Sequence, residues 1–157
     1  MNWWRNRRGE GYVAVQAVLM ALVAAGPWID PGTGSGDAAP WLLAAGCVVG
    51  AAGVALASAG AWALGRKLTP FPHPREGATL VASGAYSVVR HPIYAGLFLA
   101  ALGWALAWRS PITLVLTIIL LAFLDIKSRR EERWLVEAFP AYADYRRRVK
   151  KLVPFVY

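Results

Sequence analysis

The sequence predicts an all-α protein: an integral membrane bundle of about four transmembrane helices, followed by cytoplasmic amphipathic helices at the C-terminal end. Hydrophobic residues make up 57% of the 157 residues and charged residues only 17%, against roughly 25% charged residues in a soluble domain. Uncharged apolar runs recur along the chain, at or near the length that crosses ~30 Å of hydrocarbon. There are also eight tryptophans, a residue that favours membrane interfaces.

The first two apolar runs predict two transmembrane helices. They are Tyr12–Trp28 and Trp41–Leu64, joined by the Gly-rich turn Ile29–Pro40. A basic start before an apolar run is also typical of a signal peptide, but the first run is long and Pro27-Trp28 is a poor cleavage context. We therefore expect a retained helix.

The second helix carries small residues on one face. Gly46, Gly50 and Gly53 follow one another at helical spacing, and such faces let helices approach closely in lipid. We expect this face to pack against another helix.

The C-terminal half predicts a helical hairpin. Ile93–Trp108 and Ile112–Leu124 are both uncharged and short for a crossing, and Arg109-Ser110-Pro111 forms the turn between them. Pro92 suits the first turn of the first of these helices. The second helix should continue into water beyond Asp125 until Phe139-Pro140 breaks it. A proline-rich loop, Gly65–Ser83, precedes the hairpin, and a short amphipathic stretch, Ala141–Lys151, follows it.

We expect a single domain, residues 1–157, with two N-terminal helices in 1–64 and a C-terminal unit in 79–157. The distribution of charge along the chain predicts how this domain is oriented in the membrane. With four crossings, all 17 Lys and Arg residues except Arg109 fall on one side. The positive-inside rule makes that side the cytoplasm, and we expect a bacterial inner membrane. An outer aromatic belt would then contain Trp28, Trp41 and Trp108.

Composition argues against metal and nucleic-acid sites. Cys47 is the one cysteine, and the two histidines, His73 and His91, lie far apart in the sequence, so no metal site is expected. The net charge of +8 comes from residues that flank apolar runs, which indicates anionic lipid headgroups rather than nucleic acid as partners. The sequence is compatible with a monomer or a homodimer.

Two polar clusters should meet at the cytoplasmic end of the hairpin. One is Gly84–Gly96; the other is Lys127–Leu135, where Lys127 and Glu131 share a helical stripe with apolar residues. The plainer alternative for the second cluster is a solvated helix with Lys127–Glu131 and Ser128–Glu132 pairs. If the hairpin closes, His91 and Glu131 should lie across one pocket.

The residue types in these clusters suit a zwitterionic nucleoside that carries a sulfonium. Arg90 can bind a carboxylate in a fork, Glu131 can accept from hydroxyls or an ammonium, and Tyr86 and Tyr94 can contact a cation. The same chemistry would also allow an anionic ligand such as a lipid headgroup.

The two clusters carry a family resemblance. Gly84-x-Tyr86 with Arg90-His91-Pro92-x-Tyr94-x-Gly96, then Glu131-Glu132-x-x-Leu135 followed by Phe139, Tyr142, Tyr145 and Pro154, resembles the isoprenylcysteine carboxyl methyltransferase and phospholipid methyltransferase superfamily. The resemblance covers about 79–157. It implies a membrane enzyme that uses S-adenosylmethionine, releases S-adenosylhomocysteine and methylates a lipidic acceptor.

The resemblance also implies roles for single residues. The cofactor-binding residues would be Tyr86, Val89, Arg90, His91, Tyr94, Glu131, Glu132 and Leu135, and the catalytic residues Glu131 and Lys127. Lys127 stands where the eukaryotic carboxyl methyltransferases have an arginine, and lysine cannot grip a carboxylate in a fork. Phospholipid (ethanolamine) N-methylation is therefore an alternative, and a small four-helix transporter or scaffold is an alternative of another class.

Overall fold

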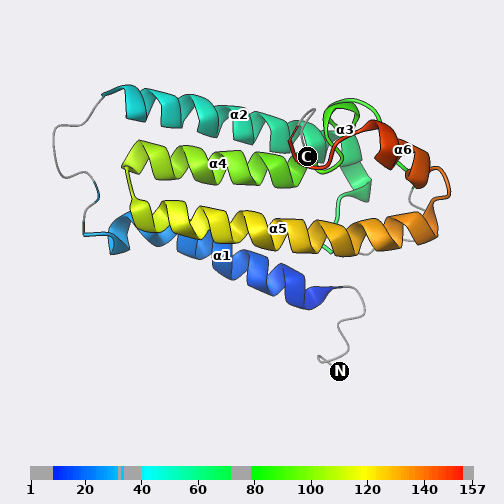
Figure 1. Ribbon diagram of the computed structural model, residues 1–157, viewed down its shortest axis with the longest axis horizontal. Coiled ribbons are helices and arrows are strands. Elements are labelled where there is room, and N and C mark those ends of the chain that lie inside the picture. The colour runs from blue at the N-terminus through cyan, green and yellow to red at the C-terminus, as the bar shows by residue number, and fades with distance from the viewer. Residues whose placement is uncertain (1–8, 32, 34–39, 72–78, 154–157) are drawn as a thin grey trace.

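Four long helices lie side by side in the computed structural model, which describes residues 9–31, 33, 40–71 and 79–153 (Figure 1). The elements in chain order are α1 Glu10–Ile29, α2 Pro40–Leu64, a short 3-10 turn η2 at Gly65–Lys67, α3 Ala85–Val88, α4 Pro92–Trp108, α5 Pro111–Ala138 and α6 Tyr142–Arg148. The described residues form no strand beyond one isolated bridge between Val89 and Lys150. The prediction of an all-α bundle is confirmed.

The lengths of these helices fit a membrane. Helices α1, α2 and α5 are each long and apolar enough to cross a bilayer, and α4 is a shorter apolar helix of 17 residues. Large apolar side chains such as Val18, Val48 and Ile118 are exposed along the bundle, as expected for surfaces that face lipid rather than water. The chain is an integral membrane protein.

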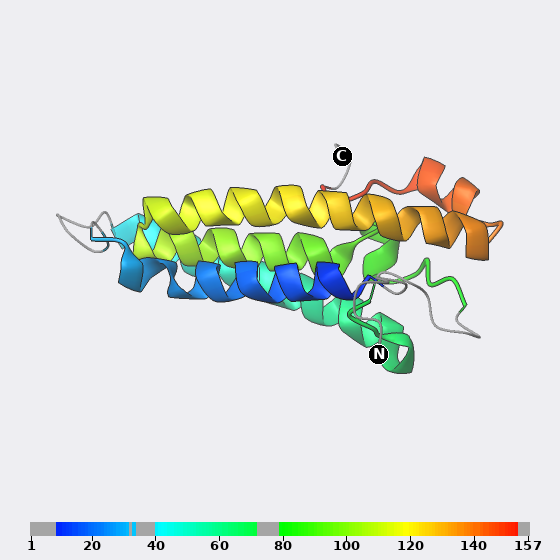
Figure 2. The same ribbon diagram turned by 90° about the horizontal axis from the view of Figure 1, so that it is seen from below.

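The four helices pack in a fixed order. Helix α2 packs on α4, and α5 packs on both α4 and α1. The start of α1, the end of α2, and helices α3 and α6 gather at one end of the bundle (Figures 1 and 2). Both predicted polar clusters therefore lie at the same end, as the charge pattern required.

Polar side chains fix the opposite end of the hairpin. The hydroxyl of Ser110 caps α5 by accepting from the backbone N–H of Thr113 at 3.1 Å, and it donates to Asp30 Oδ2 at 2.7 Å. The same Asp30 oxygen accepts from the backbone N–H of Ile112 at 3.2 Å. The end of α1 is thereby tied to the start of α5. Trp28 and Trp108, two of the three tryptophans assigned to the outer belt, contact each other at this end, and Trp104, which was not assigned to it, contacts both.

Three predictions on local structure need correction or lie outside the described residues. The Gly84–Gly96 stretch contains a four-residue helix, α3, that its composition did not predict. The stretch Ala141–Lys151 is helical only over Tyr142–Arg148, because its last residues extend to pair with the chain beside α4. His73, Pro154 and four of the arginines assigned to the cytoplasmic side, Arg5, Arg7, Arg8 and Arg75, fall outside the described residues.

The predicted glycine face of α2 packs against α4. A Cβ atom added at Gly46 or Gly53 would overlap the backbone of α4, and one added at Gly103 of α4 would overlap the backbone of α2. Only glycine allows the backbones of α2 and α4 to come this close, so the glycine face packs two helices of the same chain against each other.

This packing predicts opposite effects for two glycines that lie next to each other across the interface. Gly103→Ala should lower stability by roughly 1–3 kcal/mol, because its Cβ would force the helix backbones apart. Gly50→Ala should be neutral or stabilising by up to about 1 kcal/mol, since its Cβ would meet only Gly103 Cα at 3.8 Å and alanine favours helix. Thermal unfolding in detergent measures both, and equal effects would show that the interface is looser than described.

Candidate active site

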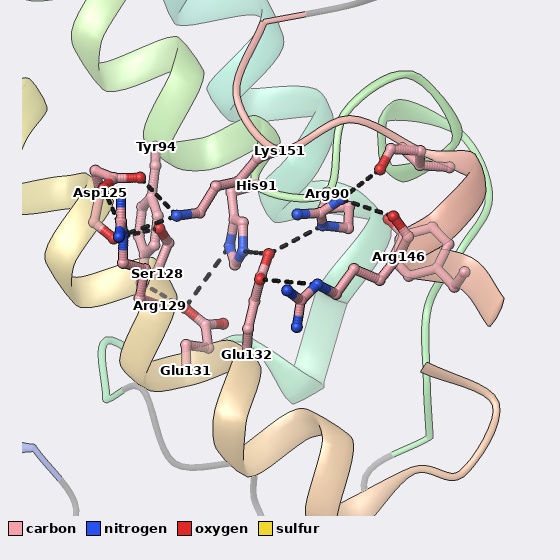
Figure 3. Close-up of polar contacts among 12 residues, drawn as sticks. Arg90, His91, Tyr94, Asp125, Ser128, Arg129, Glu131, Glu132, Arg146 and Lys151 are labelled. Atoms are coloured by element: carbon pink, nitrogen blue, oxygen red, sulfur yellow. Dashed lines mark hydrogen bonds and ion pairs between the residues drawn. The ribbon is translucent and has the colours of Figure 1, made fainter. Parts of the chain in front are cut away.

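The predicted site residues come from three helix ends that meet. Helix α3 begins at Ala85, directly after Gly84, whose positive φ of 61° suits glycine. Helix α4 begins at Pro92, which places His91 at the N-terminal boundary of that helix. The charged half of α5 runs past both, so that Glu131 and Glu132 face the start of α4 (Figure 3).

His91 sits between the two glutamates. Its Nδ1 lies 3.8 Å from Glu131 Oε2, and its Nε2 lies 3.2 Å from Glu132 Oε1. The imidazole is buried at 5% exposure and stacks on the Tyr94 ring, with the ring centroids 5.4 Å apart. The imidazole is therefore held in place by two carboxylates and one ring.

A cavity of about 290 Å³ opens on the Glu131 side of His91. We call it the inner pocket. Its lining residues come from helices α1 to α5 and the loop after α2, and they are Gln16, Leu64, Leu68, Thr69, Pro70, Tyr86, His91, Ile93, Tyr94, Lys127 and Glu131. The prediction that His91 and Glu131 lie across one pocket is confirmed.

Lys127 is a buried cation in this pocket with neutral partners. Its ammonium donates to Gln16 Oε1 at 2.5 Å and to the Pro70 carbonyl at 3.1 Å, and it lies 5.3 Å from the centre of the Tyr94 ring. Among the described residues, no carboxylate oxygen lies within 4 Å of it. The side chain is only 2% exposed, so an anionic group in the pocket would find a positive charge that lacks a direct counter-ion.

Glu131 presents its carboxylate to the same space. The Tyr94 hydroxyl donates to Glu131 Oε2 at 2.7 Å. Burial, with the nearby Glu131 carboxylate as a second cause, raises the pKa of Tyr86 above its usual value. Both phenols thus lie beside Glu131, and Tyr86 stays a neutral hydrogen-bonding group at physiological pH.

The Arg90 and Glu132 side chains do not line the inner pocket. Arg90 Nε donates to Glu132 Oε1 at 2.9 Å, and Arg90 Nη1 donates to the carbonyls of Arg146 and Val149 at 3.0 and 2.5 Å. These two side chains line a second, open cavity of about 800 Å³. We call it the basic groove.

The segment after α6 closes over the start of α4. The backbone N–H of Arg90 donates to the Lys150 carbonyl at 2.8 Å, and that of His91 donates to the Lys151 carbonyl at 3.1 Å. The Tyr145 hydroxyl donates to the Tyr86 carbonyl at 2.6 Å. Burial raises the pKa of Tyr145 to about 12, with Arg90 opposing that shift and Glu132 adding to it, so this phenol keeps its donated proton.

The structure divides the predicted site residues into three groups. Tyr86, His91, Tyr94, Lys127 and Glu131 line the inner pocket, and Arg90 and Glu132 line the basic groove. Val89 and Leu135 line neither: Val89 is fully buried beside Ala95 and Leu152. The alternative of a solvated helix does not fit, because Lys127, Ser128 and Glu132 are all buried.

Gln16 is a polar residue of the inner pocket that was not predicted to belong to the site. It is the strong polar residue of an otherwise apolar first span, and that isolation is the signal that marks it. Within the described parts of the chain, no group of three or more His, Cys, Asp and Glu residues is arranged to hold a metal ion.

Known proteins resemble this chain over most of its length. It is 32% identical over 157 residues to the cobalt-zinc-cadmium resistance protein CzcN of Cupriavidus metallidurans, a match covering 96% of this chain and 64% of that protein. The nickel-cobalt-cadmium resistance protein NccN of Alcaligenes xylosoxydans is 33% identical over 155 residues, with 96% and 65% covered. The chain thus spans slightly less than two thirds of these relatives.

A second group of relatives matches the part that holds the site. The protein-S-isoprenylcysteine O-methyltransferase of Saccharomyces cerevisiae is 40% identical over 79 residues, covering 49% of this chain and 33% of that protein. A family model described as phospholipid methyltransferase matches residues 41–142. This range includes all of α2 except its first residue, and the residues of α3, α4 and α5 that line the inner pocket. It also includes the α5 residues that line the basic groove. Since this match spans well over half of the chain, the protein belongs to the phospholipid methyltransferase family.

Proposed function

We propose that this protein is an S-adenosylmethionine-dependent methyltransferase of the isoprenylcysteine carboxyl methyltransferase type, acting on a lipidic acceptor held in the membrane. The observation that carries the proposal is the grouping of His91, Tyr94, Lys127 and Glu131 around the inner pocket. Charged and aromatic groups meet there at the polar end of an apolar bundle. Family membership supports the same reaction class.

The residues of the inner pocket fit this cofactor. The Glu131 carboxylate and the Tyr94 ring are suited to a sulfonium cation, since both attract positive charge. Lys127 offers an ammonium to a carboxylate, and the Tyr86 ring offers a face to an adenine. The cavity of about 290 Å³ lies near the lower end of the roughly 300–1,000 Å³ that small-molecule sites occupy. S-adenosylmethionine would supply an electrophilic methyl group, and S-adenosylhomocysteine would be the product.

The chain's own contribution is positioning and exclusion of water. Lys127 and His91 are 2% and 5% exposed, so charges in the pocket interact more strongly than they would in water. A carboxylate acceptor would need no base. An amine acceptor must lose a proton, and Glu131, beside the Tyr94 hydroxyl, is the group placed to accept it.

The acceptor is expected to come from the bilayer. The inner pocket is lined by Gln16 of α1, by Leu64 at the end of α2 and by Leu68 directly after η2. Helix α1 makes its contacts with α5 and α4 rather than with α2. A lipid tail could therefore enter between α1 and α2. With the positive-inside topology, the pocket would face the cytoplasm, and a bacterial inner membrane is the setting we propose.

Two acceptor classes follow from different observations. Sequence similarity to the isoprenylcysteine methyltransferases favours a carboxylate, whereas the phospholipid methyltransferase family match and the lysine at 127 favour an ethanolamine headgroup. The transporter and scaffold alternatives leave the buried Lys127 and the half-buried Glu131 side chains without a role.

Calorimetric titration of S-adenosylhomocysteine into detergent-purified protein tests the proposal. We expect saturable one-site binding that His91→Ala weakens strongly. Transfer of a radiolabelled methyl group to extracted phospholipid or to a prenylcysteine analogue then separates the two acceptor classes. A folded sample that binds neither S-adenosylmethionine nor its product would overturn the proposal.

A further inference from the structure

The basic groove lies outside the inner pocket and has its own charge. It is formed by the outer side of α5 together with α6 and the segment after it. Seven of its ten lining residues are Lys or Arg and two are Glu. The neighbouring Asp125 and Asp144 pair with groove residues as well. Four carboxylates therefore face seven cations, and the groove keeps an excess of positive charge.

Two of these cations are available to a ligand. Arg133 on α5 and Lys150 after α6 are both exposed, and neither forms an ion pair within the described part of the chain. They line the same cavity of about 800 Å³, which is large enough for a phosphate-bearing headgroup. Arginine and lysine are the side chains that bind phosphate best.

The groove continues an apolar strip on α5. The exposed residues of this face follow one another every three or four positions: Val115, Ile119, Ala122, Ile126, Arg129, Arg133 and Val136. The face therefore changes from apolar to basic within about one turn after Ile126. A bilayer changes from acyl chains to phosphates over a similar distance at its surface, so this one face matches both parts of a phospholipid.

We propose that the basic groove binds the phosphate headgroup of an anionic phospholipid whose acyl chains lie along the apolar strip of α5. Basic clusters directly after a transmembrane helix attract anionic lipids, by about 1 kcal/mol per Lys or Arg. The lipid bridges α5 and the segment after α6, and so holds the C-terminal segment that covers the start of α4. This site is separate from the proposed methyl-transfer pocket.

Thermal unfolding of the detergent-purified protein measures this binding, because a ligand that binds only the folded state raises the unfolding temperature. Phosphatidylglycerol should raise that temperature saturably, whereas phosphatidylcholine at the same mole fraction and millimolar inorganic phosphate should not. This comparison uses the unaltered chain. Equal effects of the two lipids, or an equal effect of free phosphate, would overturn the proposal.

A matched pair of variants locates the site. Arg133→Gln with Lys150→Gln removes two groove charges and should weaken phosphatidylglycerol binding by roughly 30-fold. Arg130→Gln with Arg148→Gln removes two charges from α5 and α6 that do not line the groove and should leave binding nearly unchanged. Equal losses in both variants would show general charge attraction and contradict a site.

The cofactor provides the last control. Saturating S-adenosylhomocysteine should leave the affinity for phosphatidylglycerol unchanged, since the groove and the inner pocket are separate cavities. Displacement of the lipid by S-adenosylhomocysteine would mean that the groove belongs to the cofactor site, and it would overturn the proposal. The lipid titration itself does not require methyltransferase activity.

Discussion

Glu131→Gln is expected to weaken S-adenosylmethionine binding by roughly 30-fold or more and to lower methyl transfer by at least as much. Glutamine keeps the shape of the side chain and can still accept from the Tyr94 hydroxyl, but it lacks the negative charge. An attraction between unit charges in a partly buried site contributes about 2–4 kcal/mol, and each 1.4 kcal/mol is tenfold in affinity.

The product distinguishes this charge effect from a general loss of structure. S-adenosylhomocysteine has no sulfonium, so its affinity should fall only a few-fold in Glu131→Gln. Glu137→Gln is the matched control, because Glu137 lies on the same helix, is exposed and does not line the inner pocket. Calorimetry with both ligands measures the ratio. An equal loss for both ligands would mean that Glu131 supports the pocket without attracting the sulfonium.

The long helices could be predicted from the sequence because local signals define them. Apolar runs end at charged residues, Pro92 and Pro111 begin helices, and Phe139-Pro140 ends one. The closeness of His91 and Glu131 was also predictable, since a closed hairpin brings the start of one helix beside the end of the next. These features depend on order along the chain and on helix geometry alone.

The division of the site into two cavities follows from helix geometry, which a list of the residue types in the cluster does not reveal. Consecutive residues on a helix point about 100° apart, so Glu131 and Glu132 cannot both face one pocket. Glu131 shares its side of α5 with Lys127, and Glu132 lies one turn after Ser128. His91 contacts both carboxylates because its two ring nitrogens point in different directions.

Contacts distant in sequence could not be predicted. The helical spacing of four residues indicates a Lys127–Glu131 pair, yet the Lys127 ammonium bonds to Gln16, 111 residues away. Arg90 resembled a ligand-binding residue, but three donated bonds tie it to Glu132 and to the carbonyls around α6. Local sequence patterns do not specify which helix ends come together, and the contacts of Lys127 and Arg90 form only once those ends have met.

Arg90→Met should cause the largest loss of stability among the site variants. The Arg90 and Glu132 side chains are only 10% and 7% exposed, and removing one partner of a buried ion pair typically costs about 3–5 kcal/mol, because the other charge stays buried. The two carbonyls that Arg90 Nη1 bonds would also lose their donor. We expect a lower unfolding temperature and easier proteolytic cleavage between α5 and the C-terminal segment.

Two further variants separate the buried contact from surface charge. Arg129→Met breaks the ion pair with Asp125, but that arginine is 65% exposed, so the cost should stay below about 1 kcal/mol. Arg90→Lys keeps the charge near Glu132, yet an ammonium cannot reproduce the planar fork of donors, so it should restore only part of the stability. If Arg90→Met and Arg129→Met were equally mild, Arg90 would not hold the C-terminal segment. A strong loss in Arg90→Met with a mild one in Arg129→Met would show that the buried Arg90 contacts hold the C-terminal segment, whose Lys151 carbonyl accepts from the His91 backbone N–H.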